Sequence, residues 1–413
     1  MVFPGLVMLT LYALMVSPGL GGTSDSIHYI WAAHTWRDTT SLLSPDGRPY
    51  RFWGPLYPLL IAAFYGSFGV RILHGVALLA HLSLWCRVGM WFLAPGPARW
   101  LPWFIALSSA ILVPAKFIWS ETVFGALAAA YMYAVVSWSR NKRAGRLGLA
   151  TAVGFLLPLQ RTMGFFLLAG VGVGLVLTGQ WRGQWRGLLL HWAGCAAGGL
   201  AWNYYAEVLA GPPMYRSAQA AEALGAVADY GFVLARWFVP LVASWRDMAP
   251  GLWALVLMAS LFFLFPKHQT RQHLTLSATD EPIAATLLRM RLVWWTVLVT
   301  VSALVMATRT GRAAVGPHDA ERYCVVLVGP ITLLALWQWS RFMNARSVAA
   351  NNKRWLGYIL LGGWLTSSAV RAGHNVMQLR QRPAIAWPSA GISSSIIGAK
   401  KTDFSFKQRS PPP

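Results

Sequence analysis

The sequence is poor in acidic residues: only 13 of its 413 residues are Asp or Glu, against 35 Lys and Arg. Charged residues together make up 12% of the chain, whereas soluble domains carry about a quarter. This scarcity of charge excludes an ordinary soluble protein. Long uncharged runs, enriched in aromatic residues and containing many of the 23 Trp, instead indicate a helical membrane protein.

Cysteine is also scarce, and its three positions, Cys86, Cys195 and Cys324, lie far apart in or beside apolar runs. The spacing excludes a disulfide framework and a Cys-x-x-Cys metal pair. The apolar runs do not alternate with polar residues, which argues against a transmembrane β-barrel. The net charge of +22 is spread over short loops instead of one stripe, so we expect no nucleic-acid partner.

Apolar spans dominate the chain and predict an all-α, polytopic membrane protein with about 11 transmembrane helices. The expected spans lie at 2–20, 72–93, 100–117, 122–138, 147–159, 164–178, 188–208, 251–265, 292–308, 323–339 and 355–370. We expect a retained first span over 2–20, a membrane domain over 1–370 and a polar, basic, poorly ordered tail over 371–413. Lys and Arg collect in cytoplasmic loops, which places the N-terminus inside. The loops assigned to the cytoplasmic side are 140–146, 180–187, 267–291 and 341–354.

The polar intervals that fall on the outer side are 21–71, 209–250 and 309–322. Ten of the 13 acidic residues lie on this side. In the first interval we predict a surface helix over 26–36 and an interfacial or re-entrant segment over 56–68, which is too short to cross a membrane. In the second we predict an interfacial piece over 232–245. The spans form a scaffold in this interpretation, and the first outer loop holds the site.

The first outer loop opens with Asp25-Ser26-x-x-Tyr29 and closes with Pro55-x-Tyr57-Pro58, before an apolar run that ends at Gly69. Further motifs follow in order: Ile118-Trp119-Ser120-Glu121, Leu159-Gln160-Arg161-Thr162-Met163-Gly164, and Glu321-Arg322-Tyr323 before Pro330. In order and spacing, about residues 1–340 resemble the GT-C superfamily of integral-membrane glycosyltransferases. The branch it resembles includes the protein O-mannosyltransferases and the lipid A aminoarabinose transferase.

The chain departs from that family pattern at two places. Ser26 stands where the mannosyltransferases have a second acidic residue. Trp53 and Gly54 occupy the positions where a basic residue usually precedes the Pro motif, and Arg51 is the nearest substitute.

The resemblance implies a GT-C-like helix arrangement with outer juxtamembrane helices. It also implies transfer of a sugar, with inversion, from a polyprenyl-phosphate donor to an acceptor on the non-cytoplasmic side. The expected partners are that donor, membrane lipids and an acceptor that is a lipid, a glycan or a protein. The expected location is a bacterial inner membrane, with the site facing outward.

Such chemistry needs a base and cationic partners for the leaving phosphate. A carboxylate at the membrane surface can act as the base, and we select Asp25 first and Glu121 second. Arginine suits phosphate oxygens best, so we select Arg161 first and then Arg322 and Arg51. The candidates for substrate contact are Tyr29, Tyr57, His28 and Trp53.

Each candidate also has a structural interpretation. Asp25 could cap the helix that follows it, and Glu121 could lie at a helix N-terminus to match the dipole. Arg161 and Arg322 could anchor the chain at the interface by snorkelling.

The sequence requires no cofactor. The outer histidines His28, His34 and His318 permit a divalent metal, but no ligand spacing demands one. The alternative function is a transporter or lipid flippase without transferase activity. That class favours ionisable residues near the bilayer midplane and broken spans in matching halves, whereas the acids here gather at one surface. A third possibility is that the protein is an inactive assembly subunit with the same fold.

Overall fold

The computed structural model describes residues 1–413 except 52, 211–221, 239–282, 311–316, 345–350 and 388–413. The predicted span over 251–265 lies outside the described residues, as do most of the second outer loop (209–250), most of the loop at 267–291 and the end of the tail.

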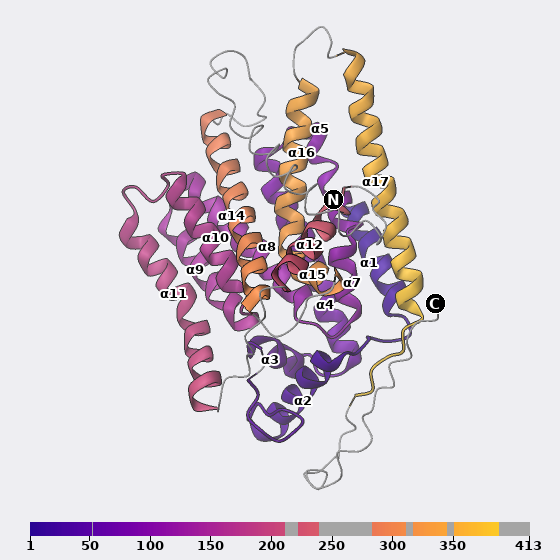
Figure 1. Cartoon of the computed structure of the whole chain (residues 1–413), viewed down its shortest axis with the longest axis vertical. Helices are drawn as coiled ribbons and strands as arrows, with labels where there is room; N and C mark the ends of the chain where they lie inside the picture. Colours follow the sequence, from indigo (N-terminus) through magenta and orange to yellow (C-terminus); the bar gives the residue numbers. More distant parts are fainter. Residues whose placement is uncertain (52, 211–221, 239–282, 311–316, 345–350, 388–413) are drawn as a thin grey trace.

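The regular secondary structure of the described residues is helical, apart from two isolated β-bridges, which confirms the all-α prediction. A bundle of long helices forms the body (Figure 1), because a backbone in lipid must satisfy its own hydrogen bonds. The bundle helices are α1 Val2–Val16, α4 Ser67–Phe92, α6 Leu101–Ala106, α7 Ser109–Lys116, α8 Glu121–Asn141, α9 Ala144–Gln160, α10 Gly164–Leu177, α11 Trp185–Tyr204, α14 Ile283–Thr310, α16 Val328–Asn344 and α17 Asn351–Arg380.

Shorter helices connect or cover the bundle. They are α2 Ser24–Thr39, α3 Leu56–Ala63, α5 Pro95–Ala98, the π-helix η1 Tyr205–Leu209, α12 Glu222–Ala235, α15 Pro317–Tyr323 and the 3₁₀-helix η3 Cys324–Leu327.

Several helices are long and apolar enough to cross a membrane, which defines a multi-pass integral membrane protein. Within the described residues there are five such segments: Ser67–Phe92, Pro95–Lys116, Glu121–Asn141, Ala285–Ala307 and Ala320–Arg341. Val2–Val16 and Gly164–Leu177 are shorter apolar helices. Each predicted span that falls on described residues lies largely on helix, although α1 ends at Val16 and the span over 100–117 is split between α6 and α7. The total of 11 crossings stays a prediction.

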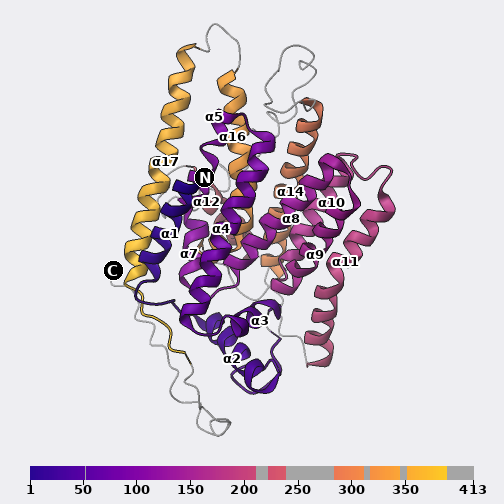
Figure 2. The same cartoon turned by 180° about the vertical axis from the view of Figure 1, so that it is seen from behind.

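The two ends of the bundle carry different loops. Helices α2 and α3 lie at one end, and α5 lies at the other (Figures 1 and 2). At the α5 end the Lys142 Nζ donates to the carbonyl of Gln180 at 3.3 Å, which joins two of the loops that we assigned to the cytoplasmic side.

The predicted span over 100–117 is broken. Helix α6 ends at Ala106, and Ser108 takes an extended backbone (ψ 120°) before α7 begins. Lys116 at the end of α7 is fully buried, and its Nζ donates to the carbonyls of Met15 at 3.1 Å and Gly19 at 2.8 Å. A lysine is tolerated inside this apolar region because a carbonyl in the last turn of α1 and one just after that helix accept its hydrogen bonds.

The helix predicted over 26–36 is present as α2. Its buried residues Ser26, Tyr29, Ile30 and Ala33 recur at helical spacing, and this face packs against protein, including α3. For the segment over 232–245, the interfacial location stays a prediction, and the structure describes its residues 232–238. Phe232, Val233 and Leu234 of that segment are buried inside the bundle.

The C-terminal helix α17 continues past residue 370 to Arg380, and the chain after it returns to the first outer loop. The Ile385 N–H donates to the Leu20 carbonyl at 2.9 Å. A Cβ on Gly22 would lie 2.3 Å from the Ile385 side chain, so glycine permits this close approach.

Candidate functional site

Helix α2 carries Asp25 in its first turn, and its N-terminus is capped by other residues. The Thr23 N–H donates to Ser26 Oγ at 3.0 Å, and Thr23 and Ser26 form a reciprocal capping box. Asp25 is therefore not the capping residue, and its carboxylate is available for other partners.

A short pairing joins the start of α2 to the segment before α8. The Gly21 N–H donates to the Lys116 carbonyl at 2.8 Å, and the Ile118 N–H donates to the Gly21 carbonyl at 3.2 Å. Ser26 Oγ then donates to the Ile118 carbonyl at 3.1 Å. This pairing sets Asp25 beside Glu121, although 96 positions separate them in the chain.

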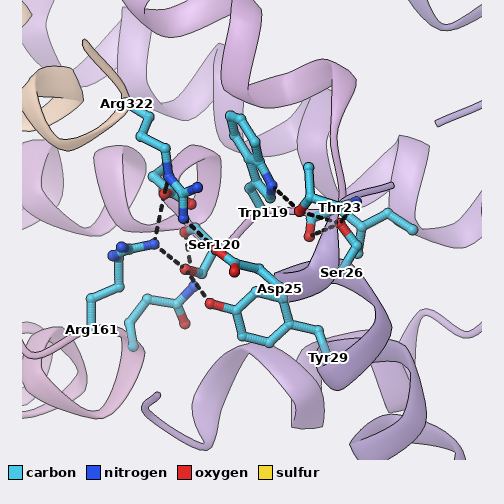
Figure 3. A network of polar contacts seen from close by, with 11 residues as sticks. Thr23, Asp25, Ser26, Tyr29, Trp119, Ser120, Arg161 and Arg322 are labelled. Atoms are coloured by element: carbon cyan, nitrogen blue, oxygen red, sulfur yellow. Dashed lines mark hydrogen bonds and ion pairs between the residues drawn. The ribbon is translucent and has the colours of Figure 1, made fainter. Parts of the chain in front are cut away.

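An ion-pair cluster joins four of the sequence candidates (Figure 3). Arg322 bonds Asp25 Oδ2 through Nη2 and Glu121 Oε1 through Nε, both at 2.5 Å. Arg161 Nη1 lies 2.8 Å from the same Glu121 oxygen. The four side chains come from α2, the start of α8, the turn after α9 and α15, and their two positive and two negative charges balance.

The members of the cluster differ in accessibility. The Glu121 side chain is 1% exposed and those of Arg161 and Arg322 are below 10%, whereas that of Asp25 is 17% exposed. Both arginines point into the protein, which excludes snorkelling as their role. Burial acts to lower the pKa of Arg161, but the Glu121 carboxylate raises it above its ordinary value.

Ser120 is a member of the site that the sequence analysis missed. Its hydroxyl accepts from Arg161 Nη1 at 2.8 Å and lies 3.1 Å from the Tyr29 hydroxyl. Gln160 Nε2 donates to the Ser120 carbonyl at 3.1 Å. The sequence offered one signal for Ser120, its position next to Glu121 at the start of a span. Its contacts with Arg161, Tyr29 and Gln160 depend on the tertiary fold.

Aromatic residues of the first outer loop pack around Tyr29. Its ring centroid lies 5.1 Å from that of Trp53 and 4.9 Å from that of Tyr57. The Tyr57 hydroxyl lies 2.8 Å from His74 Nε2. Burial raises the pKa of Tyr29, so its phenol stays protonated and keeps its hydrogen bond.

The remaining two candidates lie beside this aromatic group. The His28 ring lies 6.0 Å from that of Trp53, and burial lowers the pKa of His28 although Asp25 opposes the shift. Arg51 Nη1 donates to the Ala210 carbonyl at 3.1 Å, after η1. The structure therefore brings Arg161 and Arg322 into the charged cluster and ties Arg51 to a different segment.

Among the residues that the structure describes, no three His, Cys, Asp or Glu side chains gather as metal ligands. The charged cluster is built from carboxylates and guanidinium groups, and the guanidinium groups are donors that suit phosphate oxygens.

No family model matches the chain, and no curated protein matches it in sequence. The structure is similar to that of ArnT from Cupriavidus metallidurans bound to undecaprenyl phosphate. The TM-score is 0.54 at 12% identity, over 92% of this chain and 75% of that chain. The apo state of the same ArnT gives a TM-score of 0.46 at the same identity and coverage. The chain has the fold of ArnT, which confirms the GT-C resemblance at the level of the fold.

Proposed function

We propose that this protein is a membrane glycosyltransferase that moves a sugar from a polyprenyl-phosphate donor to an acceptor on the non-cytoplasmic side, with inversion. The location is a bacterial inner membrane, with the site facing outward. The ArnT-like fold supports this function, since ArnT itself has been captured with undecaprenyl phosphate.

The observation that carries the proposal is the cluster of Asp25, Glu121, Arg161 and Arg322 at the end of the bundle that holds α2 and α3. Buried charges are costly unless they are paired, and such groups in a membrane protein are functional by default. A carboxylate and two guanidinium groups supply the base and the phosphate partners that the transfer requires.

Asp25 acts as the base. It is the most accessible of the four residues, and the Arg322 guanidinium holds it in place. Its carboxylate removes the proton of the acceptor hydroxyl while the acceptor oxygen bonds to the anomeric carbon of the sugar. The bond from that carbon to the phosphate oxygen breaks at the same time, and polyprenyl phosphate leaves.

Arg161 binds the leaving phosphate. The hydrogen bonds of its side chain to described residues all leave from Nη1, so Nε and Nη2 remain for a ligand. A guanidinium group forms paired hydrogen bonds with phosphate oxygens and keeps its charge at any physiological pH. Arg322 assists from the other side of Glu121.

Glu121 positions the arginines and is too buried to meet the acceptor. Its Oε1 receives both guanidinium groups, while its buried Oε2 has no hydrogen-bond partner in the described structure. A carboxylate placed between two arginines keeps them close together in spite of their like charges.

The test is transfer by the purified protein in liposomes, with short-chain polyprenyl-phosphate sugars as donors. Arg161→Ala should raise the donor KM by about tenfold or more, the value of a charged hydrogen bond. Arg48→Ala is the matched control, because the Arg48 side chain is 73% exposed in the same outer loop. Flipping of the donor lipid without any release of polyprenyl phosphate would contradict the transferase and support the flippase alternative.

A further inference from the structure

A second cluster of the same chemical type lies beside the first. Glu321, the neighbour of Arg322 in α15, accepts from two guanidinium groups. Arg236 Nη2 reaches Glu321 Oε2 at 2.6 Å, and Arg371 Nη2 reaches Glu321 Oε1 at 2.5 Å. Arg371 also donates to the carbonyl of Arg236 at 3.2 Å, so the two arginines are held side by side.

The two clusters differ in their charge balance. In the first, Arg161 and Arg322 share Glu121, and Asp25 completes neutrality. In the second, two arginines and one glutamate leave a net charge of +1. Glu321 is the one carboxylate bonded to either arginine within the described part of the chain, and the buried Arg236 Nε has no partner there. Among the described residues, no second carboxylate takes the position in this cluster that Asp25 has in the first.

A pocket opens at this position. Arg236 and Arg371 line it, and each side chain is about a fifth exposed, so both guanidinium groups are within reach of a ligand. Hydroxyl groups from three helices and the break between α6 and α7 line it as well. They belong to Ser108, Ser109, Thr332, Ser367 and Ser368.

We propose that this pocket binds a phosphate group. Two guanidinium groups and several hydroxyls offer more hydrogen-bond donors than a halide or a carboxylate can accept, whereas a phosphate carries several acceptor oxygens. A partly buried, unbalanced positive charge also disfavours the empty state, and a bound anion reduces that cost. The phosphate is either a lipid headgroup or the free ion. The site is distinct from the Asp25 cluster, and its occupancy does not depend on transferase activity.

The test measures ligand-dependent thermal unfolding of the purified full chain in phosphate-free detergent. The three probes are dioctanoyl phosphatidic acid, inorganic phosphate and neutral dioctanoylglycerol. Wild type should show a saturable rise in the unfolding midpoint with a phosphate probe and none with dioctanoylglycerol. A response to phosphatidic acid alone identifies a lipid headgroup, and a response to both phosphate probes identifies the phosphate group itself.

The variants locate the binding. Arg371→Gln should weaken the apparent affinity by about tenfold or more, since it removes a charged hydrogen-bond donor. Ser368→Leu fills the pocket, leaves the arginines in place and should give the same loss, which covers the case in which Arg371→Gln fails to fold. Arg380→Gln, on the exposed end of α17, should bind as wild type does. The proposal is wrong if neither phosphate probe binds, if dioctanoylglycerol matches phosphatidic acid, or if Ser368→Leu binds like wild type.

Discussion

Asp25 and Arg322 are 297 positions apart in the chain, and their side chains form an ion pair of 2.5 Å. The same guanidinium group bonds Glu121 and lies over the Trp119 ring, 4.4 Å from its centroid. Arg322 therefore joins the first outer loop and α8 to the late segment α15. The geometry of the site therefore depends on the Arg322 side chain, which comes from a segment late in the sequence.

We predict that Arg322→Gln destabilises the protein by about 3–5 kcal/mol, because it leaves Asp25 without its cation and the buried Glu121 with Arg161 alone. The second change Glu121→Gln should recover part of this loss, since the two residues interact directly. Thermal or denaturant unfolding in detergent measures both effects. Arg48→Gln, which removes an exposed pair with Asp46, should cost less than about 1 kcal/mol. A cost of that small size for Arg322→Gln would show that the pair carries little energy.

Gly54 is predicted to be required for packing of the first outer loop against the end of α9. A Cβ at this position would lie 1.9 Å from the Leu159 carbonyl oxygen, next to Gln160 and Arg161. Gly54→Ala should therefore cost about 1–3 kcal/mol and lower transfer, because the backbone must shift. Gly145→Ala in α9 is the control. Nothing lies within 4 Å of its added Cβ, and the change should be neutral or slightly stabilising. Equal stability of the two variants would show that Gly54 is not required for packing of the first outer loop.

Two truncations separate the parts of the C-terminal segment. Deleting residues 390–413 should leave the protein folded and active, as the polar composition of that segment indicates. Deleting 383–413 should cost about 1–3 kcal/mol and lower activity. It removes Ile385, which bonds the Leu20 carbonyl, and Trp387, whose ring packs on Tyr65. Unfolding and transfer are measured for both proteins. Identical behaviour of the two would contradict a role for residues 383–389.

The predicted orientation is tested by labelling from one side of the membrane. Asn141 and Ser41 are exposed at opposite ends of the bundle, and the native Cys86, Cys195 and Cys324 are buried. Cysteines introduced at Asn141 and Ser41 should react from opposite sides with a reagent that does not cross the membrane. The positive-inside rule predicts that Asn141 faces the cytoplasm. Reaction of both from the same side would overturn the topology.

Composition and apolar run length were sufficient to predict the helical membrane fold and most helix positions. Motif order also selected Asp25, Glu121, Arg161 and Arg322, which the structure brings together. Run length could not reveal the break at Ser108, because the residues on both sides of it are equally apolar. The role of Lys116 could not be predicted either, since the carbonyls that accept its hydrogen bonds belong to Met15 and Gly19, about 100 positions away in the chain.

The partners within each cluster could not be predicted, because they depend on contacts between distant segments. Ser120 carries no charge, and its bonds to Arg161 and Tyr29 arise only after α2 and α8 pack together. Arg371 was assigned to a tail by its sequence position, although it lies in α17 and bonds Glu321. Pairing of this kind needs the tertiary structure.

The most direct measurement is sugar transfer by purified wild type and Asp25→Asn with a short-chain polyprenyl-phosphate donor. The amide keeps the shape of the side chain and removes its charge and basicity. If Asp25 is the base, the transfer rate should fall by roughly 10²–10⁴-fold, while expression and donor binding persist. Asp46→Asn, an exposed change in the same loop, should transfer at the wild-type rate. Wild-type transfer by Asp25→Asn would contradict the mechanism.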